Sequence, residues 1–176
     1  MTWEHRLFDL FEDLEQQAEG LSRAERDAEV AELAVSGYSE VGLADRVHAS
    51  VGADVELSLT GSEVVRGRLT RAGADWCLVR TDTPAGEWIV RLAALTAARG
   101  LSPRAVPEAS RRVTARLGWG AVLRSLAEDR RPVLVLGVDG HRRQGLVRRV
   151  GADFLELAGE ADVWVLPLGG VAALRG

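Results

Sequence analysis

The chain has 176 residues, of which 47% are hydrophobic and 27% charged, and its formal net charge is −4. This composition is typical of a globular protein and excludes a disordered chain, while the single cysteine, Cys77, excludes a disulfide framework and a cysteine-rich metal site. No apolar run approaches the roughly 18 residues needed to cross a bilayer, and the acidic N-terminus is unlike a secretion signal. We therefore expect a cytoplasmic protein with no membrane partner.

Charge is segregated along the chain. Residues 1–45 carry 12 acidic and 3 basic residues, a net charge of −9, whereas residues 46–176 carry 14 acidic and 19 basic residues, a net charge of +5. All 22 basic residues are arginine. Together with the abundant Ala, Gly, Val and Leu, this bias indicates a GC-rich genome, so it is weak evidence for nucleic-acid binding even though arginine suits phosphate geometry.

The first segment, residues 1–37, has the pattern of an acidic amphipathic helix. Gly20 is a stop signal, and Ser22 with Glu25 forms a capping box that starts a second helix. One long helix and a helical hairpin both fit, and the segment either packs on the rest of the fold or pairs with a second copy of itself. Apolar residues recur on one helix face at spacings of four and three: Leu7, Phe11, Leu14, Ala18 and Leu21.

Comparison of the sequence with itself indicates an internal duplication. The segment GRLTRAGADWCLV (67–79) matches GLVRRVGADFLEL (145–157), and EWIVRLAALTAARG (87–100) matches the segment 162–176. The repeated residues include Gly67 and Gly145, Arg71 and Arg149, Gly73 and Gly151, Asp75 and Asp153, and Trp88 and Trp164.

Each copy is expected to form a short helix followed by five short strands. The alternating segment VELSL (55–59) and its counterpart VLVLG (133–137) are typical of strands. A Gly-Ala-Asp turn follows the second strand of each copy, because glycine tolerates positive φ and aspartate can bond its own turn. The repeated turn residues are Gly73, Asp75, Gly151 and Asp153.

Five short strands cannot bury a face while they lie flat, so each copy is expected to close into a small barrel. The fold class is then mostly β with helices (α+β). One copy alone is too small to bury much surface, so the barrels are expected to pack as a pseudo-symmetric pair, with Trp88 and Trp164 in the core or between barrels. The expected domains are an acidic helical segment, a first barrel, a proline-containing linker and a second barrel: 1–37, 38–100, 101–112 and 113–176.

The two copies resemble Sm-like folds, which are five-stranded SH3-like barrels preceded by a helix. The resemblance covers residues of about 40–100 and 118–176, and the segment Ala94–Ala97 also resembles the entry to the fifth strand in the bacterial host-factor branch. The chain as a whole resembles proteins of high-GC actinobacteria. The residues that carry the Sm-like resemblance are VELSLTG (55–61), Gly67, Leu69 and Asp75 in the first copy and Gly145, Val147 and Asp153 in the second.

The sequence departs from Sm-like proteins at their RNA-binding positions. In those proteins an Asn follows the turn Asp by three or four residues, but this chain contains no Asn at all. A Lys-His pair that contacts RNA in the host-factor branch corresponds to Leu92–Ala93 and Leu168–Gly169 here. The resemblance therefore implies the fold without the usual RNA pocket, and a fold does not carry a function with it.

The sequence does not favour catalysis. His5, His48 and His141 lie in three different segments, and none has metal-ligand spacing to Cys, Asp or Glu. His141 is interpreted as a solvated turn residue, and Cys77 as a buried strand residue. We expect a protein that is not an enzyme, with no metal, no cofactor and no small-molecule substrate.

Clustered arginines are the one positive functional signal. They could neutralise phosphates, they could be the solvated outer face of a soluble protein, or the acidic N-terminal segment could lie across them. The candidate nucleic-acid-binding residues are Arg66, Arg68, Arg71, Arg142, Arg143, Arg148 and Arg149.

Two functional hypotheses follow. The first is a non-enzymatic assembly or adaptor protein that binds itself or a protein partner through exposed barrel edges and its N-terminal helix. The second is an RNA-binding regulator that uses the arginine surface. The missing Asn and the negative net charge favour the first.

Overall fold

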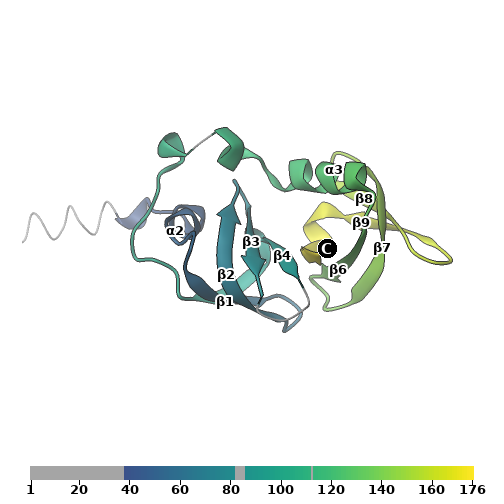
Figure 1. Ribbon diagram of the computed structural model, residues 1–176, viewed down its shortest axis with the longest axis horizontal. Helices are drawn as coiled ribbons and strands as arrows, with labels where there is room; N and C mark the ends of the chain where they lie inside the picture. Colours follow the sequence, from purple (N-terminus) through teal and green to yellow (C-terminus); the bar gives the residue numbers. More distant parts are fainter. Residues whose placement is uncertain (1–37, 82–85, 112) are drawn as a thin grey trace, which may run out of the picture. The chain divides into compact units, whose positions relative to one another are not determined.

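The computed structural model describes residues 38–81, 86–111 and 113–176 (Figure 1). The helix or helical hairpin expected over 1–37, and its pairing with a second copy, lie outside the described residues. Residues Gly42–Gly176 form one compact unit.

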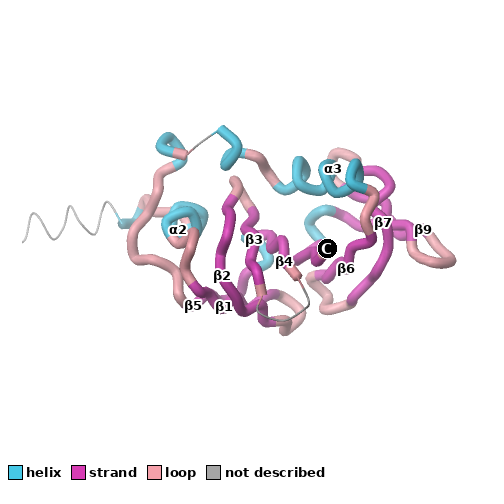
Figure 2. The backbone as a smooth tube through the Cα atoms, in the orientation of Figure 1, coloured by secondary structure: helices cyan, strands magenta, loops and turns pink. Residues whose placement is uncertain are grey.

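The unit contains two sets of five strands, each preceded by a helix (Figures 1 and 2). The first set comprises α2 (Leu43–Ala49), β1 (Asp54–Leu59), β2 (Val64–Ala72), β3 (Trp76–Arg80), β4 (Glu87–Arg91), the 3-10 turn η1 (Leu92–Ala94) and β5 (Leu95–Arg99). The connection contains the 3-10 turns η2 (Glu108–Ser110) and η3 (Val113–Arg116). The second set comprises α3 (Trp119–Asp129), β6 (Pro132–Gly137), β7 (Arg142–Val150), β8 (Phe154–Ala158), β9 (Val163–Pro167), η4 (Leu168–Gly170) and β10 (Val171–Arg175).

All ten strands belong to one antiparallel sheet, in the order β5-β1-β2-β3-β4-β10-β6-β7-β8-β9. The expectation of two closed five-stranded Sm-like barrels is therefore wrong. A closed barrel would pair the fourth and fifth strands of each set, but β4 pairs with β10 across the two sets. Because β10 satisfies the outer backbone groups of β4, the sheet continues from one set into the next and stays open at β5 and β9.

The two halves of the sheet repeat the same pairings in the same register. Ser58 opposes Ala97 between β1 and β5, and the corresponding Leu136 opposes Ala173 between β6 and β10. Register shifts also recur at matching places, between Leu69 and Arg71 in one half and between Val147 and Arg149 in the other. The stretches 55–99 and 133–175 thus follow one topology, as the sequence repeat predicts.

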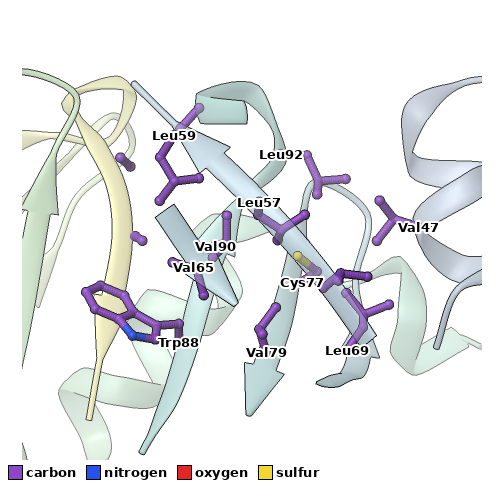
Figure 3. Close-up of a cluster of buried hydrophobic side chains, with 14 of the residues drawn as sticks. Val47, Leu57, Leu59, Val65, Leu69, Cys77, Val79, Trp88, Val90 and Leu92 are labelled. Atoms are coloured by element: carbon purple, nitrogen blue, oxygen red, sulfur yellow. The ribbon is translucent and has the colours of Figure 1, made fainter. Parts of the chain in front are cut away.

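The hydrophobic core follows the alternation of the strands. Buried Leu57, Leu69 and Val79 point from β1, β2 and β3 into one cluster, which Val47 of α2 covers (Figure 3). The cluster also includes Leu136 from the second half of the sheet. A second cluster contains buried residues of α3, β6, β7, β8 and β10, with Ile89 and Trp76 of the first half packed against it. Both cores therefore extend across the β4–β10 junction.

Two of the repeated glycine pairs are explained by close contacts. A Cβ at Gly67 would lie 2.1 Å from the Arg80 carbonyl oxygen, and one at Gly145 would lie 2.3 Å from that of Ala158. At Gly73 a Cβ would meet the ring of Trp76 at 2.1 Å, and Gly151 is covered by Phe154 in the same way. Since no side chain fits, each half of the sheet requires glycine at both places.

The segment between the two halves is anchored to α2. The Arg46 Nε donates to the Ser102 carbonyl at 2.9 Å, and the Ser102 amide donates to the Ser50 hydroxyl at 2.8 Å. The guanidinium of Arg111 forms an ion pair with Asp45 at 2.5 Å, and its side chain is only 6% exposed. The region expected to be a linker, 101–112, is thus tied to the first half by polar contacts at several points.

Candidate functional site at the open edges of the sheet

The strand β9 is one open edge of the sheet, and it is apolar on its exposed surface. Val163, Trp164 and Val165 are 47%, 48% and 62% exposed. The corresponding residues of β4 are Glu87, Trp88 and Ile89; Trp88 is only 6% exposed because β10 lies beside it. The same strand position is therefore covered in the first half of the sheet and uncovered in the second.

The backbone of β9 is oriented for strand addition. The amide of Gly159 donates to the Asp162 carbonyl at 2.9 Å, which makes these residues a hydrogen-bonded pair at the β8–β9 turn. Bonded and non-bonded pairs alternate along an antiparallel ladder, and the β8–β9 register has no shift. The N–H and C=O groups of Val163 and Val165 are consequently directed away from β8, toward the open edge.

The two repeated tryptophans have different environments. The Arg175 guanidinium lies 5.4 Å from the ring centroid of Trp88, and Arg143 lies 5.1 Å from that of Trp164. The expectation of core or inter-barrel packing holds for Trp88 and is wrong for Trp164, because no strand among the described residues covers β9. A cation–π contact stabilises each ring, but Trp164 keeps nearly half of its surface exposed.

The strand β5 is the other open edge, and it is lined by small side chains. Thr96, Ala97, Ala98 and Arg99 are exposed, whereas the corresponding Ala172, Ala173 and Leu174 of β10 are buried between β4 and β6. The Thr96 hydroxyl is turned back to the sheet, where it donates to the Ser58 carbonyl at 3.1 Å. Small residues leave the outer backbone of β5 accessible.

Several of the candidate arginines are paired with carboxylates. Arg66 donates to Glu56 at 2.7 Å, which lowers the pKa of that carboxyl. Arg149 donates to both oxygens of Glu156, at 2.7 and 2.9 Å, and this contact raises the pKa of Arg149.

Two more candidate arginines lie beside carboxylates of the hairpins. Arg142 forms an ion pair with Glu63 in the other half of the sheet, and Arg143 lies 3.6 Å from Asp139. Four of the seven candidate arginines, Arg66, Arg142, Arg143 and Arg149, therefore lie beside neighbouring acids. Within the described residues, three of the candidates have no hydrogen-bond or ion-pair partner: Arg68, Arg71 and Arg148.

The structure does not bring the seven arginines into one surface. Arg66 and Arg142 meet at a groove of about 750 Å³ between the halves, which Arg99 and Arg175 also line. Asp54, Glu56 and Glu63 line the same groove, so its charge is mixed. Arg71 lines a different cavity, next to His48, and Arg148 and Arg149 line a third.

The repeated turn residues have structural contacts. The main-chain oxygen of Asp75 accepts the amide of Leu92 at 2.8 Å, and that of Asp153 accepts the amide of Leu168 at 2.7 Å. The carboxylate of Asp75 also accepts the amide of Trp119, the first residue of α3, at 2.6 Å. Asp75 thus connects the first half of the sheet to the helix of the second half and stabilises the start of that helix.

The described residues hold no cluster of three or more His, Cys, Asp or Glu that could bind a metal ion. Cys77 is fully buried in β3, as expected, and burial raises the pKa of its thiol to about 12. His141 is exposed at a hairpin and lies 3.3 Å from Asp139, as expected for a solvated turn residue. His48 contacts the Gly73 carbonyl at 2.9 Å, and burial lowers its pKa.

The apolar edge at β9 was missed in the sequence, although the repeat contained a signal for it. Glu87 in the first copy is replaced by Val163 in the second, so a charged position becomes apolar at the strand with no neighbour. Natural edge strands usually carry charges that prevent pairing. The loss of a charge at this position is therefore the feature of the sequence that distinguishes the β9 edge from β4.

Comparison with known proteins gives no family: no family model matches the sequence, and no curated protein matches it significantly. The Sm-like and actinobacterial resemblances stay hypotheses. Within the part of the chain that the structure describes, no helix is long and apolar enough to cross a membrane.

Proposed function

We propose that the chain is a non-enzymatic assembly module that binds a polypeptide strand along its β9 edge. The supporting observation is the contrast between equivalent strands: β4 is completed by β10, and β9 exposes an apolar surface and outward backbone groups. Strand addition uses such groups for affinity and adjacent side chains for specificity.

Site-specific crosslinking tests this proposal. The photoreactive residue p-benzoylphenylalanine replaces Val165 in the full chain, and the control replaces Leu146, which is 40% exposed on β7 but has a strand on each side. We expect a polypeptide adduct at position 165. The adduct should be lost in Val163→Pro, because proline removes an outward N–H group, and it should be retained in Val163→Thr. Equal adducts at both positions, or none at 165, would contradict it.

Nucleic-acid binding is the second candidate function. Three arginines with no partner among the described residues, Arg68, Arg71 and Arg148, support it. Mobility shifts with uridine-rich and mixed RNA at several salt concentrations test it, and the variant Arg68→Glu/Arg148→Glu should weaken binding and reduce its salt dependence. Binding that is unaffected by this variant would exclude these arginines as the site.

A further inference from the structure

We infer that the cavity between α2, β2 and the connection binds a small aromatic carboxylic acid, and that Arg71 holds its carboxylate. The cavity has a volume of about 760 Å³, which is within the range of small-molecule sites in proteins. Its lining residues belong to the first half of the sheet and the connection, whereas β9 belongs to the second half. The inference is therefore independent of the proposed function.

The sequence repeat gives the reason for a carboxylate ligand. Arg149, the counterpart of Arg71, opposes Glu156 in the β7–β8 register and donates to both of its carboxylate oxygens, at 2.7 and 2.9 Å. Arg71 opposes Leu78 at the same place in the β2–β3 register. The first half therefore has the arginine without the carboxylate. Within the described residues Arg71 has no hydrogen-bond or ion-pair partner, and it lines the cavity instead.

The other basic groups at the cavity leave one uncompensated positive charge, that of Arg71. Arg111 also lines the cavity, but its guanidinium is paired with Asp45 at 2.5 Å. His48 donates from Nε2 to the Gly73 carbonyl at 2.9 Å, and burial lowers its pKa, so the ring is neutral at pH 7. One unpaired guanidinium matches one carboxylate, which it binds through two parallel hydrogen bonds. A dianionic phosphate would keep an excess negative charge.

The remaining lining fits the aromatic body of such an acid. Trp76 donates its indole N–H to the Leu117 carbonyl at 2.8 Å, which fixes the ring against the connection. Val51 and Leu117, which also line the cavity, are 49% and 52% exposed. A bound aromatic ring would cover these apolar side chains and pack against the indole of Trp76.

The walls of the cavity are held by backbone hydrogen bonds that are already formed. The Val106 amide donates to the Asp45 carbonyl at 3.0 Å, and the Ala74 amide donates to the Leu117 carbonyl at 3.1 Å. These bonds tie Val106 and Leu117, two lining residues of the connection, to the first half of the sheet. A ligand that enters a site formed in advance loses less affinity to the ordering of the protein.

NMR titration of the full ¹⁵N-labelled chain with phenylacetate at pH 7 tests the inference. Phenylacetamide, in which a neutral amide replaces the carboxylate, is the matched ligand control. We expect phenylacetate to bind with a dissociation constant on the order of 1 mM, as is usual for a ligand of this size. Phenylacetamide should bind about ten times more weakly, because it lacks the charge-assisted hydrogen bonds. The largest amide shifts should occur at Val51, Trp76 and Leu117.

The variant Arg71→Gln tests which residue holds the carboxylate. Arg71 is exposed, so the fold should be kept, and the amide spectrum of the variant checks this directly. Phenylacetate binding should weaken by about tenfold, whereas phenylacetamide binding should not change. Arg68→Gln is the matched control, because it removes the same charge from an exposed residue of the same strand that does not line the cavity. This control should bind phenylacetate like the wild-type chain.

Four outcomes would overturn the inference. Phenylacetamide that binds as tightly as phenylacetate would show a site for the ring alone, and phenyl phosphate that binds more tightly would contradict the match to a single charge. Unchanged phenylacetate binding in Arg71→Gln, or equal weakening in Arg68→Gln, would exclude Arg71 as the specific anchor. Absence of shifts at the cavity with phenylacetate at about 20 mM would exclude the site itself.

Discussion

The two repeated tryptophans allow a matched test of how the sheet continues across its halves. A tryptophan side chain covers about 200 Å², which at about 25 cal/mol per Å² corresponds to about 5 kcal/mol for full burial. Trp88, 6% exposed beside β10, gains nearly all of this, whereas Trp164, 48% exposed on the open edge, gains roughly half. Since the unfolded chain is itself partly compact, these values are upper limits.

We therefore expect Trp88→Ala to lower the free energy of unfolding by about 4 kcal/mol and Trp164→Ala to lower it by about 2 kcal/mol. Urea denaturation followed by far-UV circular dichroism measures both losses. Equal losses, or a larger loss for Trp164→Ala, would refute the conclusion that the junction covers one ring and leaves the other exposed.

Three further predictions concern the stability of the fold. Asp75→Ala should lower the free energy of unfolding in urea by about 1–2 kcal/mol, because it removes the acceptor of the Trp119 amide. Asp153→Ala loses no such contact with α3 and should lower it by less. Equal losses would contradict the role of that hydrogen bond. Gly67→Ala should destabilise the fold by about 2 kcal/mol or more, because the added Cβ would lie 2.1 Å from the Arg80 carbonyl oxygen. Gly169→Ala, whose Cβ would have no atom within 4 Å, should be nearly neutral. A neutral Gly67→Ala would show that the strands can separate at this point. Burial raises the pKa of Cys77 from 9.0 to about 12, so the folded state keeps a proton that the unfolded state loses, and stability should fall as pH rises above 9. The chain has no lysine, so Cys77→Ala should visibly flatten that decline in denaturation curves between pH 9 and 11, and an unchanged slope would exclude the thiol as its source.

The repeat in the sequence predicted two sets of five strands that follow the same chain path, because alternation and turn residues are local properties. It did not predict the pairing of β4 with β10. Periodicity indicates which face of a strand is buried. The neighbouring strand, however, is bound through backbone N–H and C=O groups, which are the same for nearly every residue type and so leave no pattern in the sequence. Closed barrels and a continuous sheet therefore have the same local pattern.

The candidate arginines show a similar limit. Their sequence spacing indicates an exposed basic face, yet the register places Glu56 opposite Arg66 and Glu156 opposite Arg149. The partner of each arginine lies on a neighbouring strand, where sequence spacing gives no information without the register. The sequence contains the change from Glu87 to Val163, but only the strand order shows that this residue lies on an edge strand.

The central position of β10 makes the two halves dependent on one short segment. Residues 171–175 come last among the ten strands, yet they lie between β4 and β6. During synthesis, the outer edge of β4 stays unpaired until residues 171–175 have been made. Proteolysis that removes these residues would expose the edges of β4 and β6 at once. A chain that lacks residues 171–175 would then expose more unpaired strand edges than the intact chain. We expect loss of this segment to promote aggregation.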